Sequence, residues 1–230
     1  MSLLLKQLAY RSIGTKNYFL LQSLNRLRRG YDESYKRFVE ALPLGSCLLD
    51  IGANIGVTVA FAKRLRPDLN LVAFEPLPFN VAAAQRLCRV LRVRDVRFHQ
   101  VALGDAVGTV QMFMPTVAQI QASAQSYVVH DGYEYPEFVR KEGREFTVPL
   151  ITIDSLDLPQ VHGIKLDVEN FEAYVLRGAR QLVERDRPAI YCELWDTDNR
   201  REVIQFLGNL GYSYEATEAK DDFVFRCQAH

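Results

Sequence analysis

The chain has 230 residues, of which 48% are hydrophobic, and this is enough apolar material for one well-buried domain. Lysine plus arginine balance aspartate plus glutamate at 28 each, whereas proteins that bind duplex nucleic acid usually carry a strong basic excess, so we expect no nucleic-acid partner. The four cysteines show no CxxC spacing, and a zinc site is therefore not expected.

The first 45 residues predict a helical extension, because apolar residues recur there at spacings of three to four, with interruptions at Gly14 and Gly30. Residues 1–40 contain eight basic and three acidic side chains, a charge of +5, and the rest of the chain carries −5. This excess is compatible with peripheral contact with an anionic membrane surface, and also with a solvated basic helix face. Lys6, Arg11 and Lys16 interrupt the apolar runs, so we expect neither a signal peptide nor a membrane span, and a cytoplasmic location.

Residues 46–230 alternate short apolar strands with amphipathic helices. Strands are predicted at 46–51, 70–75, 96–101, 162–167 and 188–194. Helices are predicted at 56–66, 78–92, 170–184 and 198–210, and a closing hairpin at Tyr212–Ala216 and Phe223–Cys227. This order predicts a doubly wound α/β domain with a mostly parallel, seven-stranded sheet.

One stretch, residues 104–152, departs from the alternation. Strands are predicted at Val107–Pro115 and Glu145–Ile153, with a polar and aromatic segment between them. A long connection in a compact domain is usually functional or mobile, so residues 115–145 are predicted to cover the substrate.

The segment Asp50-Ile51-Gly52-Ala53-Asn54-Ile55-Gly56 takes a buried strand into two glycines and then a helix, which is where an open α/β sheet binds ligands. Gly52 lets the backbone approach a ligand, Gly56 permits the tight entry into the helix, and the free N–H groups of the helix suit a carboxylate. The spacing is not the G-x-G-x-x-G of dinucleotide sites. Asp50 would repel a pyrophosphate, but it can pair with the ammonium group of a methionine moiety.

A second acid, Glu75, ends the next predicted strand 25 residues later, where a carboxylate can accept hydrogen bonds from both ribose hydroxyls. Pro76 holds Glu75 extended. Either acid alone also fits a strand-end cap in some other α/β protein. Together they predict S-adenosylmethionine (SAM) as the cofactor.

The chain resembles the FkbM family of methyltransferases over about residues 46–195. The matching segments are Asp50 to Gly56, Phe74-Glu75-Pro76-Leu77-Pro78-Phe79-Asn80, Ala102-Leu103-Gly104-Asp105, Thr152 to Leu156, Ile164 to Glu172, and Arg187-Pro188 to Glu193. The resemblance implies a class I, Rossmann-like fold and SAM-dependent methyl transfer to hydroxyls of polyketides, saccharides or glycolipids. With it, the predicted cofactor-binding residues are Asp50, Gly52, Ala53, Asn54, Gly56, Glu75, Pro76, Asn80 and Ala102.

One departure from the family pattern is Asn170, where the family usually has glycine. Asparagine is among the few other residues tolerated at positive φ, so we expect the backbone conformation to be kept. A changed substrate contact at this position stays open.

Methyl transfer to a hydroxyl needs a positioned oxygen and a group that removes or shares its proton. At the predicted strand end 162–167, the candidates are Lys165, Asp167 and Glu169; the two acids can share one hydroxyl or one divalent ion such as Mg²⁺, and Glu193 can join them. Lys165 and Glu169 are also interpretable as a structural ion pair. His130, which Asp131 can orient, is a further candidate base or simply an exposed loop residue.

The leading hypothesis is therefore an O-methyltransferase acting on a saccharide or glycolipid hydroxyl. The alternatives are an O-methyltransferase of a polyketide-type natural product and a non-catalytic SAM-binding module; the zero net charge disfavours an RNA methyltransferase. The acceptor, the need for a metal and the oligomeric state stay open at this point.

Overall fold

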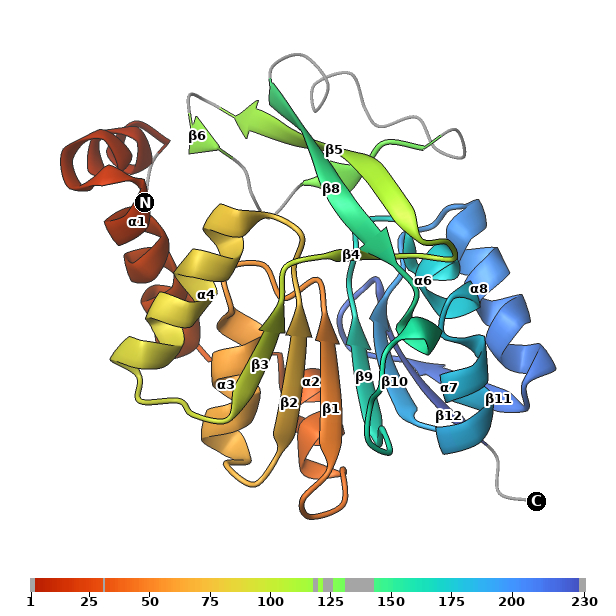
Figure 1. Cartoon of the computed structure of the whole chain (residues 1–230). Coiled ribbons are helices and arrows are strands. Elements are labelled where there is room, and N and C mark those ends of the chain that lie inside the picture. Colours follow the sequence, from red (N-terminus) through yellow and green to blue (C-terminus); the bar gives the residue numbers. More distant parts are fainter. Residues whose placement is uncertain (1–2, 31, 118–119, 122–125, 131–142, 228–230) are drawn as a thin grey trace.

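The computed structural model describes residues 3–30, 32–117, 120–121, 126–130 and 143–227 (Figure 1). Its centre is a seven-stranded sheet in the order β11-β12-β10-β9-β1-β2-β3. The parallel strands are β1 (Cys47–Ile51), β2 (Asn70–Phe74), β3 (Val96–His99), β9 (Gly163–Leu166) and β10 (Ala189–Glu193). The closing hairpin consists of β11 (Tyr212–Ala216) and β12 (Asp222–Cys227), and β12 pairs antiparallel with β10. The predicted α/β fold with a mostly parallel sheet is confirmed.

Helices cover both faces of this sheet because successive side chains of a strand point to opposite faces, and in these strands the side chains on both faces are mostly apolar. Leu48 and Leu71 pack toward α2 (Glu33–Glu40), α3 (Val57–Leu65) and α4 (Pro78–Val90). Leu49 and Val72 pack into the opposite core, with α6 (Glu172–Arg177), α7 (Arg180–Asp186) and α8 (Asp198–Asn209).

The helix predicted over 170–184 is divided between α6 and α7 at Gly178 and Ala179. A Cβ at Gly178 would overlap the carbonyl oxygen of Gly104, so the backbone passes very close to a neighbouring loop here. Asp154, in the 3₁₀ turn Ile153–Ser155, then accepts hydrogen bonds at 2.9 Å from the N–H groups of Gln181 and Leu182. The N–H groups of the first turn of α7 have no acceptor within the helix, and Asp154 supplies one where this second helix begins.

The N-terminal segment is helical, as predicted: α1 spans Leu3–Arg28, with a non-helical residue at Gly14. Its C-terminal half packs against α3 and α4, where Tyr18 and Phe19 are buried with Ile55 and Val57. Within the described part of the chain, no helix combines the length and apolar character needed to cross a bilayer. The division into an extension and a domain at residue 45, and peripheral membrane contact, stay predictions.

A second, smaller sheet lies beyond the carboxyl ends of the parallel strands (Figure 1). It contains β4 (Ala102–Leu103), β5 (Gly108–Val117), β6 (Ile120–Gln121), β7 (Tyr127–Val128) and β8 (Gly143–Ile151), with β5 and β8 antiparallel. The strand predicted at 96–101 is therefore shorter, because β4 pairs with β8 instead. Most of the predicted cover, including residues 118–119, 122–125 and 131–142, lies outside the described residues.

Candidate functional site

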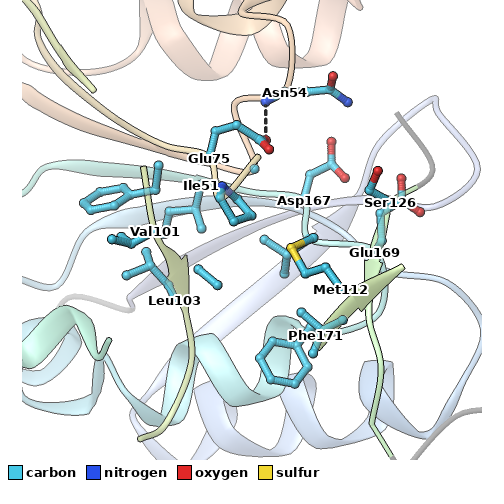
Figure 2. A pocket seen from close by; sticks show the side chains of 16 residues that line it. Ile51, Asn54, Glu75, Val101, Leu103, Met112, Ser126, Asp167, Glu169 and Phe171 are labelled. Carbon is cyan, nitrogen blue, oxygen red and sulfur yellow. Dashed lines mark hydrogen bonds between the residues drawn. The ribbon is translucent and has the colours of Figure 1, made fainter. Parts of the chain in front are cut away.

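A pocket opens to solvent at the carboxyl ends of β1, β2 and β9, under the smaller sheet, and the space in it and at its mouth is about 620 Å³ (Figure 2). Its walls are mainly apolar side chains from segments far apart in the sequence: Ile51, Phe74, Val101, Leu103, Met112, Val128, Val168 and Phe171. Its polar groups include Asn54, Glu75, Ser126, Asp167 and Glu169. Apolar walls with a few convergent polar groups are typical of a small-molecule site.

Glu75 follows β2 and is nearly completely buried beside this pocket. Its Oε2 accepts a hydrogen bond of 2.9 Å from the N–H of Asn54 (Figure 2). Its Oε1 accepts from the N–H of Leu77 at 3.0 Å and from Nδ2 of Asn80 at 3.1 Å. Burial raises the pKa of this carboxyl to about 6, against the effect of these donors. Pro76 lines the pocket beside it, whereas Asn80 acts through Glu75.

The two glycines serve different purposes. Gly52 has φ of 80°, and a Cβ there would overlap the carbonyl oxygen of Asp167, so any side chain would separate the loop from β9. Gly56 has φ of 81° and does not line the pocket; its missing Cβ lets α3 lie against Ala84 of α4. Ala53 and Asn54 face a neighbouring pocket on the same loop.

The structure places Asp50 differently from the direct ligand contact expected. Its carboxylate is completely buried, and Oδ1 lies 3.6 Å from Nζ of Lys165, its partner in the β1–β9 register. The same Nζ donates hydrogen bonds of 3.1 Å to the Gly52 carbonyl and to Oδ2 of Asp167. Lys165 therefore fixes the glycine loop against β9, and Asp50, which lines none of the pockets at this sheet edge, supports the loop through this network.

Four carboxyl groups gather around the ends of β9 and β10: Asp167, Glu169, Glu172 and Glu193. Burial, together with the neighbouring charge of Asp167, raises the pKa of Glu169 to about 9 and that of Glu193 to about 8. Burial also raises the pKa of Glu172 to about 7, but this side chain is occupied: it accepts from the Val168 N–H and from Nδ2 of Asn199. Asp167, Glu169 and Glu193 are left facing the pockets.

Glu169 and Asn170 both have left-handed backbone, with φ of 56° and 70°. The expectation of a positive φ at Asn170 is confirmed, and its buried Oδ1 accepts a hydrogen bond of 2.6 Å from the Thr197 hydroxyl. This contact explains how a side chain replaces the glycine typical of this position. A non-glycine residue such as Glu169 in this region is strained, and such strain is often found at functional sites.

Two other expectations lack support from the geometry. Among the described residues, no group of three or more histidine, cysteine, aspartate or glutamate side chains is arranged to hold a metal ion, and Mg²⁺ gains no support. His130 is absent from the lining of the pockets at the sheet edge and lies instead against the rings of Phe171 and Tyr174, with centroids 5.4 and 5.3 Å away. Its role as a general base stays a prediction. Asp131 lies outside the described residues.

Two further pockets continue the first one along the sheet edge. One shares Gly52, Asn54, Asp167 and Glu169 with the first pocket and adds Arg26, and the other adds Arg29 and Asp222. The sequence did not single out these three residues. Of the wall formed by Val101, Ala102 and Leu103, the sequence predicted only Ala102 as a cofactor-binding residue.

Comparison with known proteins agrees with this geometry. A family model described as the methyltransferase FkbM domain matches residues 50–214. Methyltransferase 1 of Beauveria bassiana is 30% identical over 61% of this chain and 61% of its own length, and the 31-O-demethyl-FK506 methyltransferase FkbM of Streptomyces tacrolimicus is 26% identical over 81% and 80%. A crystal structure of the methyltransferase FkbM from Methylobacillus flagellatus shares the fold, with a TM-score of 0.59 at 16% identity over 84% of this chain and 47% of that one. The chain belongs to the FkbM family of methyltransferases.

Proposed function

We propose that this protein is a SAM-dependent O-methyltransferase that modifies a hydroxyl of a saccharide or glycolipid. The residues present fit SAM: apolar walls suit the adenine ring, and Glu75 offers a carboxylate for the ribose. When bound, SAM supplies a methyl group on a positively charged sulfur. The carboxyl groups of Asp167 and Glu169 lie beside the same loop, where they suit positive charge.

A hydroxyl must lose its proton as it accepts a methyl group, and the described residues offer carboxylates for this step. Asp167 and Glu169 line both the pocket beside Glu75, which we call the adenosine pocket, and the neighbouring pocket at the glycine loop. Burial and the neighbouring charge of Asp167 raise the pKa of Glu169 to about 9, so this carboxyl holds a proton at neutral pH without bound cofactor, and the positive charge of bound SAM would favour the ionised form that can accept a proton. Lys165 has a positioning role, because its ammonium group holds Asp167 and the Gly52 carbonyl.

The observation that carries the acceptor class is the polar lining of the pocket beyond Asp167. Eight of its ten lining residues have polar side chains, including Arg29, Asp32, Tyr191, Glu193 and Asp222. Each saccharide hydroxyl both donates and accepts, so a saccharide can hydrogen-bond to the guanidinium and carboxylate groups of this lining, whereas an extended apolar polyketide offers them few partners.

The experiment is methyl transfer from radiolabelled SAM to two acceptor panels, neutral saccharides and glycolipids in one and macrolide-type polyketides in the other, with products identified by mass spectrometry. We expect O-methylated saccharide or glycolipid from the wild type and none from Glu75→Ala. Transfer only to polyketides, as the name of the Streptomyces relative suggests for that protein, would replace the acceptor class. SAM binding with no transfer to either panel would favour the non-catalytic module.

A further inference from the structure

The last turn of α1 brings an arginine to the glycine loop. Arg26 lines the pocket that Gly52, Ala53, Asn54 and the start of α3 form on the side away from Glu75. This pocket joins the adenosine pocket directly, because both are lined by Gly52 and Asn54. A ligand with its ribose at Glu75 therefore extends along the loop toward α1.

The position of Arg26 is set by packing. Phe19 of α1 is buried with Ile55 of the loop and Val57, the first residue of α3, and Leu27 packs against the same cluster. These contacts fix the neighbouring turn of α1 directly on the loop. Arg26 is exposed, but its helix is held against the residues whose pocket it lines.

The charges around this pocket are divided between its walls. Asp167, Glu169 and Glu193 lie at the strand ends, and Arg26 lies on the α1 side. The other cation of the lining, Lys165, is committed to Asp167, Asp50 and the Gly52 carbonyl. In contrast, Arg26 makes no hydrogen bond or ion pair within the described part of the chain.

The methionine moiety of SAM carries an ammonium group and a carboxylate on the same carbon. The charge of Asp167 on the strand-end wall attracts the ammonium group and repels the carboxylate, and a guanidinium is the side chain best suited to bind a carboxylate through paired hydrogen bonds. The start of α3 adds to this preference, since its first turn has no acidic residue and no side-chain cap.

We propose that Arg26 binds the carboxylate of the methionine moiety, which makes α1 part of the cofactor site. The inference rests on the proposed function only in taking SAM as the methyl donor, and it is independent of the acceptor. It gives the basic end of α1 a role that requires no membrane. It also predicts that cofactor binding holds α1 more tightly on the loop.

The test is calorimetric titration of the full chain, without acceptor, with S-adenosylhomocysteine and with S-adenosyl-3-thiopropylamine, which lacks only the carboxylate. We expect Arg26→Gln to weaken binding of S-adenosylhomocysteine about tenfold or more, and binding of the decarboxylated analogue by less than about twofold. Arg26→Lys should recover part of the loss. Arg28→Gln is the matched control, because Arg28 is exposed on the same helix and lines neither pocket.

Unchanged binding of S-adenosylhomocysteine by Arg26→Gln, or an equal loss for both ligands, would overturn the inference. Melting temperatures of the variants show whether α1 has been disturbed. An equal loss of affinity for both ligands counts against the inference only in a variant that melts like the wild type. A wild-type protein that binds neither ligand contradicts the proposed function instead, so the two failures are distinguishable.

Discussion

Nζ of Lys165 lies 3.6 Å from Oδ1 of Asp50, and both side chains are buried beneath the glycine loop. The same ammonium group reaches the Gly52 carbonyl and Asp167, so one cation joins β1, the loop and the end of β9. A buried charge is costly unless it is paired, so the loss of one member of this network leaves the remaining buried charges less well compensated. The acid of the glycine motif thus helps to hold the loop that forms the site.

Asp50→Asn should lower the free energy of unfolding by about 3 kcal/mol, because it leaves the buried Lys165 with less compensation. Urea denaturation measures the change. Glu218→Gln is the control: its partner Arg37 is exposed, and loss of an exposed ion pair costs about 0–1 kcal/mol. Equal small effects of the two substitutions would show that the Asp50–Lys165 pair does not support the fold.

Glu75→Gln should weaken SAM binding by about 1.5–3 kcal/mol, the scale of a hydrogen bond to a charged group. The ribose hydroxyls are best accepted by the ionised carboxylate. Since the pKa of Glu75 is raised to about 6, wild-type affinity should fall as the pH drops below 6, whereas the affinity of the variant should change little. Calorimetry between pH 5 and 8 checks both statements. The same pH dependence in the variant would assign the titration to another group.

Asp167→Asn and Glu169→Gln should lower kcat at saturating SAM while the protein stays folded, because loss of a general base typically costs about 10²–10⁴-fold. The amides are nearly isosteric with the acids, so packing is retained. Steady-state assays on a verified acceptor measure the effect, and repeating them with a chelator, and then with added Mg²⁺, separates metal ligation from direct proton transfer. If both variants turn over like the wild type, Glu193 becomes the next candidate.

Stability should fall as the pH rises above about 5. The pKa values of Glu169 and Glu193 are raised from 4.5 to about 9 and about 8, so the native state binds more protons than the unfolded state between these limits. Because proton binding and folding are linked, the free energy of unfolding decreases as the pH rises through this window. The stability that these two protonated carboxyls contribute is complete only below about pH 4.5. Glu169→Gln cannot ionise and should be more stable than wild type at pH 8.5, by about 1 kcal/mol or more. Urea titrations at pH 6 and 8.5 test this, and an equal pH dependence of the two proteins would contradict it.

Asn170→Ala should destabilise the protein by about 1–2 kcal/mol, because alanine lacks the hydrogen bond to Thr197 and is disfavoured at a φ of 70°. Asn170→Gly should cost less, since glycine adopts this conformation freely. Thermal unfolding ranks the three proteins. A glycine variant that is less stable than the alanine variant would show that the backbone conformation is not what Asn170 provides.

The order of the strands and helices, and hence the α/β fold, could be predicted because each signal lies in a short contiguous segment. Short apolar runs predicted the strands, and the glycines after β1 predicted a loop at the sheet edge. The position of Glu75 followed in the same way, since an acid directly after a parallel strand lies at that edge whatever surrounds it.

Tertiary structure decided what each side chain meets at that edge. Asp50 faces Lys165 through strand register, His130 lies against Phe171, and Arg26 reaches the glycine loop from a helix 26 residues upstream. The break between α6 and α7 likewise depends on Gly104, far away in the sequence. Local periodicity carries no information on these contacts. They arise only when distant segments pack together, and burial then sets which carboxyl groups keep their protons.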